Sequence, residues 1–299
     1  PQFGAEGVWV SVFTAISAFC NAGFDLFGRF GAYSSLAPYV NNYYVQAVIM
    51  FMIMAGGLGF MVWVELAEHR KKRRLSLHAK VVLQFSVIFW VGGAALLALL
   101  EWSNPRTMGG LSVPGKIMAA LFQSVSTRTA GMNTIDLAAC SPISKLLMSV
   151  LQFIGAAPGS TGGGVKVTTF AVLILTIRSV AQGRDDCVIG GHHIESKTVY
   201  RALTIIVIGA VAAFGSAVVV YYNTAETVSV IDCIFESCSA FGTVGLSVGV
   251  TGQLNTGAKL LYMACMFMGR VGPVSLAISH DRQSPTTNSA KSSRWVTST

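Results

Sequence analysis

Three short stretches of this chain have a composition suited to holding a bare cation with backbone carbonyls. In each, an apolar segment is followed by a polar residue, a compact apolar residue, a glycine and another apolar residue: Asn21-Ala22-Gly23-Phe24, Thr129-Ala130-Gly131-Met132 and Thr243-Val244-Gly245-Leu246. A dehydrated cation must be surrounded by oxygens, and carbonyls can line a narrow path only where side chains leave room. Glycine leaves that room and reaches the left-handed conformations that turn successive carbonyls to one side.

The three stretches recur at intervals of a little over 100 residues, which indicates an internal repeat. A single stretch of this kind is equally well explained as a tight turn. Three in register, each near membrane-length apolar runs, favour a shared role in one cation path. We expect the ion-coordinating filter to consist of Asn21, Ala22, Gly23, Thr129, Ala130, Gly131, Thr243, Val244 and Gly245, with K+ held at these turns and no other metal site.

The composition is that of a membrane protein. Of 299 residues, 53% are hydrophobic and 11% are charged, whereas soluble domains have roughly 25% charged residues. The net charge of +8 could suggest nucleic-acid binding, but Lys and Arg lie in loops between apolar runs, where the positive-inside rule explains them. We therefore expect a lipid bilayer as the environment and no nucleic-acid partner.

Apolar runs of two lengths alternate along the chain. Short runs at residues 8–19 and 116–126, and one that begins near Phe235, are too short to cross a hydrocarbon core of about 30 Å and are predicted to be pore helices that precede the three turns. The basic loops at residues 69–80 and 179–201 are predicted to be cytoplasmic. Membrane spans are predicted at residues 45–64, 81–100, 143–177, 202–220 and 256–279.

The predicted span 143–177 cannot be one regular helix. Its middle, residues 155–164, holds Pro158 and five glycines, which would cost several kcal/mol in helical form. Irregular backbone at membrane depth is tolerated where it lines a protein cavity, so we interpret this stretch as a movable obstruction of the cation path. A nucleotide-phosphate loop is the rival interpretation, but Gly164-Val165-Lys166-Val167-Thr168 lacks the Gly-Lys-Ser/Thr sequence. The predicted gating residues are Gly155, Gly159, Ser160, Thr161, Gly162, Gly163, Gly164, Lys166 and Arg270.

Two arginines lie close to the predicted path. Arg270 is expected to hinder cation passage or to anchor the broken helix, since a charge inside a span faces a cavity or a partner; the alternative is an arginine that reaches the cytoplasmic interface. Arg128, next to the second turn, is expected to face away from the path and to pair with Asp136. The six cysteines form no Cys-x-x-Cys pair and the adjacent His192 and His193 have no third ligand nearby, so we expect no bound cofactor.

With these features in place, the sequence resembles the Ktr/Trk/HKT superfamily of potassium transporters, most closely the KtrB-type membrane subunits, which are also described as sodium-ATPase subunit J. The resemblance implies an all-α membrane protein with helix, pore loop and helix repeated around a pseudo-fourfold pore. The chain matches the second repeat from its pore helix onward and then the third and fourth, so the first repeat is expected to be missing. In this resemblance Gly23, Gly131 and Gly245 correspond to filter glycines, residues 155–164 to the gating loop and Arg270 to a barrier arginine.

The resemblance also implies the division of the chain and its partners. Potassium is the expected ion, and sodium selectivity or sodium coupling stays open because the first-repeat filter is not in this sequence. The implied partners are a second copy in a homodimer and a cytoplasmic RCK-type nucleotide-binding regulatory subunit, in a multi-pass protein of a bacterial plasma membrane. The expected parts are 1–68 (second repeat), 69–80 (basic loop), 81–178 (third repeat), 179–201 (loop), 202–280 (fourth repeat) and 281–299 (tail).

Two other functions compete with transport. An energy-coupled pump subunit or a membrane enzyme would need a nucleotide site or acid–base residues inside the spans, yet the five predicted spans hold no Asp or Glu away from their ends. We therefore expect no enzymatic activity. A membrane scaffold would leave the three glycine turns without a purpose.

Overall fold

The computed structural model describes residues 4–29, 35–72, 74–183, 188–189, 192–224 and 227–272. This part of the chain is helical apart from one pair of two-residue antiparallel strands, which confirms the predicted all-α class. The predicted tail, 281–299, and the end of the last predicted span lie outside it. The elements are α1 (Gly4–Phe19), η1 (Phe27–Arg29), η2 (Ala37–Tyr39), α2 (Tyr43–Gly57), α3 (Phe60–Lys72), α4 (Leu77–Glu101), α5 (Val113–Ser126), α6 (Pro142–Phe153), α7 (Val167–Ala181), β1 (Val188–Ile189), β2 (His192–His193), α8 (Ser196–Asn223), α9 (Val230–Gly242), η3 (Thr251–Gln253) and α10 (Thr256–Val271).

Among the described residues, two single helices are long and apolar enough to cross a bilayer, and they contain two of the predicted spans. They are α4, over 81–100, and α8, over 202–220. Both expose large apolar side chains such as Leu99 and Val211, as expected of helices that face lipid. Ser76 caps α4 by accepting a hydrogen bond from the Ala79 amide, so the helix begins at Leu77, inside the stretch 69–80 that was predicted to be a loop.

The predicted span at 45–64 is not one regular helix, because the chain bends by 98° between α2 and α3. Gly59 lies at the bend with a φ of +83°, which a residue with a side chain rarely adopts. A Cβ at Gly59 would also lie 2.5 Å from the Pro158 carbonyl oxygen, and the Phe60 amide donates to the Gly159 carbonyl. The glycine allows α3 to turn away from α2 where the loop at Pro158 and Gly159 approaches.

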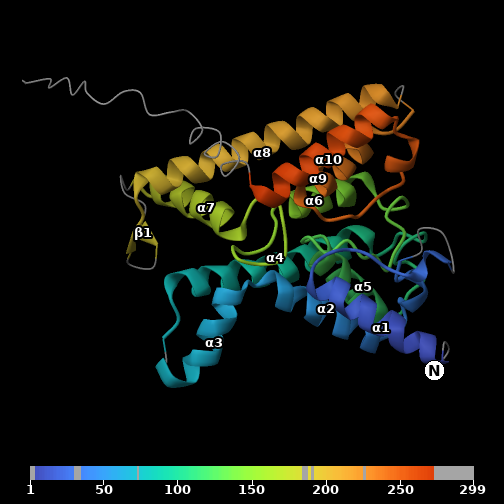
Figure 1. Cartoon of the computed structure of the whole chain (residues 1–299), viewed down its shortest axis with the longest axis horizontal. Coiled ribbons are helices and arrows are strands. Elements are labelled where there is room, and N and C mark those ends of the chain that lie inside the picture. Colours follow the sequence, from blue (N-terminus) through green and yellow to red (C-terminus); the bar gives the residue numbers. More distant parts are fainter. Residues whose placement is uncertain are drawn as a thin grey trace, which may run out of the picture.

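Figure 1 shows the helices in two groups, α1 to α5 in one and α6 to α10 in the other. Within the first group, α5 packs on α4 and α2, and α1 packs on α2. Within the second, α9 packs on α6, α8 and α10. Each short helix that precedes a glycine turn is therefore packed against at least one other helix: α1 against α2, α5 against α2 and α4, and α9 against α6, α8 and α10.

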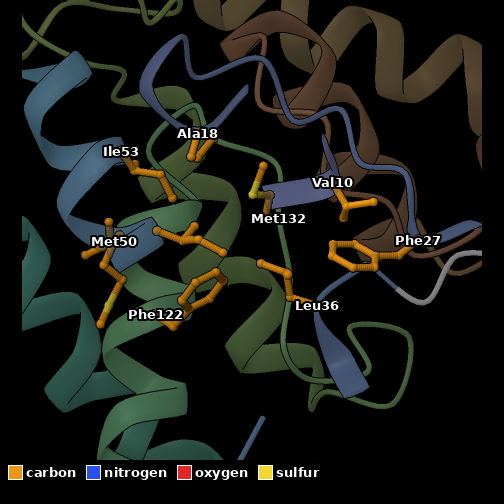
Figure 2. Packing of buried hydrophobic residues seen from close by; sticks show 11 residues of the cluster. Val10, Ala18, Phe27, Leu36, Met50, Ile53, Phe122 and Met132 are labelled. Carbon is orange, nitrogen blue, oxygen red and sulfur yellow. The ribbon is translucent and has the colours of Figure 1, made fainter. Parts of the chain in front are cut away.

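Two apolar clusters hold the residues next to the second and third glycine turns. Figure 2 shows one of them, in which Met132, the residue after Gly131, packs with side chains of α1, α2 and α5, including the fully buried Phe122. The other cluster holds Val244 and Leu246, which flank Gly245. Because Met132, Val244 and Leu246 are anchored in these cores, the backbone of the second and third turns has little freedom to shift. Phe24, beside Gly23 in the first turn, is 69% exposed.

Candidate functional site

The three glycine turns meet at one place. A Cβ built on Gly23 would lie 2.9 Å from the Ala130 carbonyl oxygen and 3.3 Å from that of Val244. A Cβ on Gly131 would collide with the same Val244 oxygen and lie 3.2 Å from the Gly23 Cα. A Cβ on Gly245 would lie 3.8 Å from the Gly131 Cα. Segments more than 100 residues apart in the sequence are thus in direct backbone contact, and a side chain at Gly23 or Gly131 would force them apart.

All three turns have the same backbone conformation. The first and third residues have positive φ angles: 48° and 72° at Asn21 and Gly23, 81° and 79° in the second turn, 54° and 92° in the third. The middle residue of each turn has no positive φ. Positive φ at these positions is the conformation that we expected the glycines to allow. The left-handed conformation costs a residue with a side chain roughly 1–2 kcal/mol, so the surroundings of Asn21, Thr129 and Thr243 must hold them in it.

The carbonyls of these turns are free. In the part of the chain that the structure describes, no hydrogen bond is accepted by any of the nine carbonyls of residues 21–23, 129–131 and 243–245. The middle amides, in contrast, are bonded to the preceding helices, at 2.9 Å from Ala22 N to Ser17 O and 2.9 Å from Val244 N to Ser239 O. Carbonyls that no protein donor pairs with are available to coordinate a cation that has lost its hydration shell.

The helices before the turns strengthen this preference for a cation. α1 ends at Phe19, α5 at Ser126 and α9 at Gly242, each within a few residues of its turn. The carboxyl end of a helix carries a partial negative charge of roughly half an electron. Three such ends lie next to the convergent carbonyls, so the local field is favourable for positive charge.

The break predicted inside 143–177 is present: α6 ends at Phe153, α7 begins at Val167 and the loop between them lies against the three turns. Asn21 Nδ2 donates to Thr161 Oγ1 at 2.7 Å. A Cβ on Gly162 would collide with Thr129 Oγ1, and a Cβ on Gly163 with Thr243 Oγ1. Three successive loop residues therefore each contact the first residue of one turn, which closes the site on that side.

The other predicted gating residues shape or hold this loop. Lys166 Nζ donates to the Gly162 carbonyl at 2.6 Å, and Arg270 Nη1 donates to the carbonyl of Thr161. Ser160 Oγ donates to the Ala157 carbonyl at 2.5 Å. Gly159 and Gly164 both have a φ of +68°, and the Gly155 amide donates to the Val165 carbonyl at 2.8 Å. Arg270 thus makes an anchoring contact, which is one of the two roles expected for it; its effect on ion passage stays a prediction.

The predicted pairing of Arg128 with Asp136 is wrong. Arg128 is buried, and its Nη2 donates to the Gly155 carbonyl at 2.6 Å while the guanidinium lies 4.9 Å from the ring centre of Phe89. Asp136 is exposed and accepts a hydrogen bond from the Ala138 amide. A carbonyl just beyond the end of α6 and an aromatic face supply the negative potential that we had assigned to a carboxylate.

One acidic group near the third turn, Glu236, was not singled out from the sequence. Glu236, within α9, is 4% exposed and accepts hydrogen bonds from Ser247 Oγ at 2.5 Å and from the Val250 amide at 3.0 Å, which ties the segment after the turn to the helix. Asp232 pairs with Lys145 of α6 at 2.7 Å. The signal for Glu236 was a carboxylate in the middle of an otherwise apolar short helix.

No group of three or more His, Cys, Asp or Glu that could hold a metal ion occurs among the described residues. The free carbonyls of the three turns are oxygens available to an ion, and among the described residues the buried Asn21 Oδ1 and Thr129 Oγ1 also have no hydrogen-bond partner.

The TrkH family profile, described as "Cation transport protein", matches residues 2–292. The chain belongs to this family. It is 35% identical to the Ktr system potassium uptake protein B of Bacillus subtilis over 280 residues, 93% of this chain and 61% of that protein. It is 36% identical to the potassium/sodium uptake protein NtpJ of Enterococcus hirae, with the same shares covered.

A solved structure supports the fold. The potassium transporter TrkH from Vibrio parahaemolyticus superposes with a TM-score of 0.71 at 18% identity, covering 94% of this chain and 64% of that one. The chain therefore spans about three fifths of the length of these relatives. The family match confirms the resemblance inferred from the glycine turns and the broken helix, and with the two long apolar helices it places the chain in a membrane.

Proposed function

We propose that this chain forms three pore-lining units of a membrane subunit that takes up potassium. The single observation that carries the proposal is the meeting of three turns that share positive φ angles at their first and third residues, with nine free carbonyls near three negative helix ends. Carbonyls in this arrangement replace the hydration shell of an alkali ion. The printed names of the relatives, potassium uptake protein B and potassium/sodium uptake protein, support the choice of ion.

The second candidate function is sodium-selective or sodium-coupled transport on the same scaffold. The potassium/sodium uptake relative favours it, and a subunit of a cation pump would use the same turns. Glycine at position three of all three turns favours potassium, because it permits the close approach of backbones that leaves only carbonyls facing the ion.

The loop at 155–164 is the gate in this proposal. Thr161, Gly162 and Gly163 lie against the turns, so an ion can leave the turns on that side only when the loop moves. Lys166 and Arg270 hold two neighbouring loop carbonyls. Movement of the loop therefore requires both cationic groups to release their carbonyls.

The remaining features of the proposal come from the family resemblance. We infer a multi-pass protein of a bacterial plasma membrane that forms a homodimer and binds an RCK-type nucleotide-binding regulatory subunit. The relatives' name of Ktr system supports a multi-component assembly. The chain binds no cofactor of its own and is a transporter, not an enzyme, with the repeats divided as predicted from the sequence.

The test is a substitution at Gly245, whose φ of +92° excludes a branched side chain. We expect Gly245→Val, in the protein made from its complete gene, to abolish potassium-dependent growth of an uptake-deficient bacterium. Gly215→Ala is the matched control, since Gly215 lies in α8 with open space around it. Normal growth of the Gly245→Val strain, with the variant present in the membrane, would refute the proposed function.

A further inference from the structure

Each of the three short helices before the turns holds a serine that bonds to the same point of its turn. Ser17 Oγ donates to the Phe24 carbonyl at 2.7 Å, and Ser239 Oγ donates to the Leu246 carbonyl at 2.7 Å. Ser126 Oγ donates to the carbonyl of Met132. In every case the acceptor belongs to the residue directly after the glycine. No sequence pattern considered above had drawn attention to these serines.

The same serines hold the turns at a second point. The backbone carbonyl of each accepts a hydrogen bond from the middle residue of its turn, from Ala22, Ala130 and Val244 respectively, at 2.9, 3.0 and 2.9 Å. Each serine therefore makes two hydrogen bonds to its turn, one through its hydroxyl and one through its backbone carbonyl. The carbonyl after the glycine is directed into the protein, and the three before it are left unpaired.

The arrangement does not follow from a fixed sequence spacing. Ser17 and Ser239 lie four residues before the first residue of their turns, whereas Ser126 lies three residues before Thr129. The two hydrogen bonds to the turn are made in spite of this shift. All three side chains are buried, at 5% exposure for Ser17, 0% for Ser126 and 3% for Ser239, so water cannot replace a lost hydroxyl at these carbonyls.

We propose that Ser17, Ser126 and Ser239 are positioning residues that set the spacing of the filter carbonyls and thereby the preference for potassium over the smaller sodium ion. This inference rests on the proposed function. Selectivity in a carbonyl-lined filter depends on cavity size and on the number of carbonyls that face the ion. Without the hydroxyl, the carbonyl after the glycine is left buried and unpaired. The turn then relaxes. Either a further carbonyl oxygen reaches the ion, or the filter carbonyls move closer together and fit the smaller sodium ion.

The experiment compares rubidium uptake, as a tracer for potassium, with sodium uptake in membrane vesicles that hold the protein made from its complete gene. We expect Ser239→Ala and Ser126→Ala each to lower the rubidium-to-sodium uptake ratio at least about fivefold, the equivalent of ~1 kcal/mol for one buried hydrogen bond. Because the readout is a ratio, a change in the amount of protein does not move it. Ser239→Thr, which keeps the hydroxyl, is expected to restore the ratio.

The matched controls are buried serines of the same two helices whose hydroxyls bond elsewhere. Ser237 of α9 pairs with Tyr262 Oη at 3.1 Å, and Ser124 of α5 donates to the Trp90 carbonyl at 2.8 Å; both are 0% exposed. We expect Ser237→Ala and Ser124→Ala to leave the uptake ratio unchanged. An effect of the same size in the controls would overturn the inference, since it would show a general response to lost buried hydroxyls.

An unchanged uptake ratio in both Ser239→Ala and Ser126→Ala would overturn the inference about the serines. If Gly245→Val still abolishes uptake in that case, the proposed function stands. If Gly245→Val transports normally, the proposed function itself fails. Should an alanine variant be missing from the membrane, the cysteine variant keeps the side-chain volume with a weaker donor, and its ratio decides in the same way.

Discussion

Removing the anchor at Arg270 should open the loop that covers the turns. Arg270 donates to the carbonyl of Thr161, and Thr161 in turn contacts Asn21 of the first turn. A hydrogen bond from a charged donor contributes about 1.5–3 kcal/mol. Since Arg270 is exposed, we take the lower end, and ~1.5 kcal/mol corresponds to a roughly tenfold larger open fraction in Arg270→Ala.

The assay is potassium flux into liposomes with a counted number of transporters. Arg270→Lys is the second variant, because it keeps a positive charge and a hydrogen-bond donor on a long side chain but loses the planar guanidinium. If a charged hydrogen bond at this carbonyl closes the loop, the lysine variant should stay closer to the original flux while the alanine variant rises about tenfold. Lys259→Ala is the control, since Lys259 is an exposed cation near the other end of α10. Flux in Arg270→Ala equal to that of the unchanged protein would refute the anchoring role.

Two further predictions concern contacts between distant segments. Thr161→Val removes the 2.7 Å bond with Asn21 and should raise flux about fivefold, the equivalent of ~1 kcal/mol; an unchanged liposome flux would contradict the contact's part in closure. Lys145→Ala leaves Asp232 without its partner at 2.7 Å, with both side chains less than a quarter exposed, and should lower the stability by about 2 kcal/mol in thermal unfolding in detergent. The double variant Lys145→Ala with Asp232→Ala should recover part of the lost stability. If Lys145→Ala unfolds at the same temperature as the original protein, the ion pair does not stabilise the fold.

The features predicted correctly from the sequence are those that local composition determines. Glycines at Gly23, Gly131 and Gly245 permit the positive φ angles that all three adopt. Pro158 with its neighbouring glycines excludes a helix by the same kind of local reasoning. Uncharged runs of sufficient length predicted α4 and α8, since length and hydropathy are properties of the segment itself.

The features that were missed depend on contacts between segments. The bend at Gly59 is stabilised by the loop at Pro158 and Gly159, which no local pattern places there. Arg128 finds a carbonyl and an aromatic ring, and a search for opposite charges cannot find such partners. One sequence pattern could have indicated two of the three serines: Ser-Ala-Phe occurs near the end of both α1 and α9, at residues 17–19 and 239–241.

The most direct test of the central claim is to locate an ion in the protein. Crystals grown in rubidium, measured at the rubidium absorption edge, would give an anomalous signal for each bound ion. The account predicts a rubidium peak ligated by carbonyls of all three turns, those at Gly23, Gly131 and Gly245, on one common axis. A peak ligated by a single turn, or no peak between the turns in crystals that bind rubidium elsewhere, would contradict it.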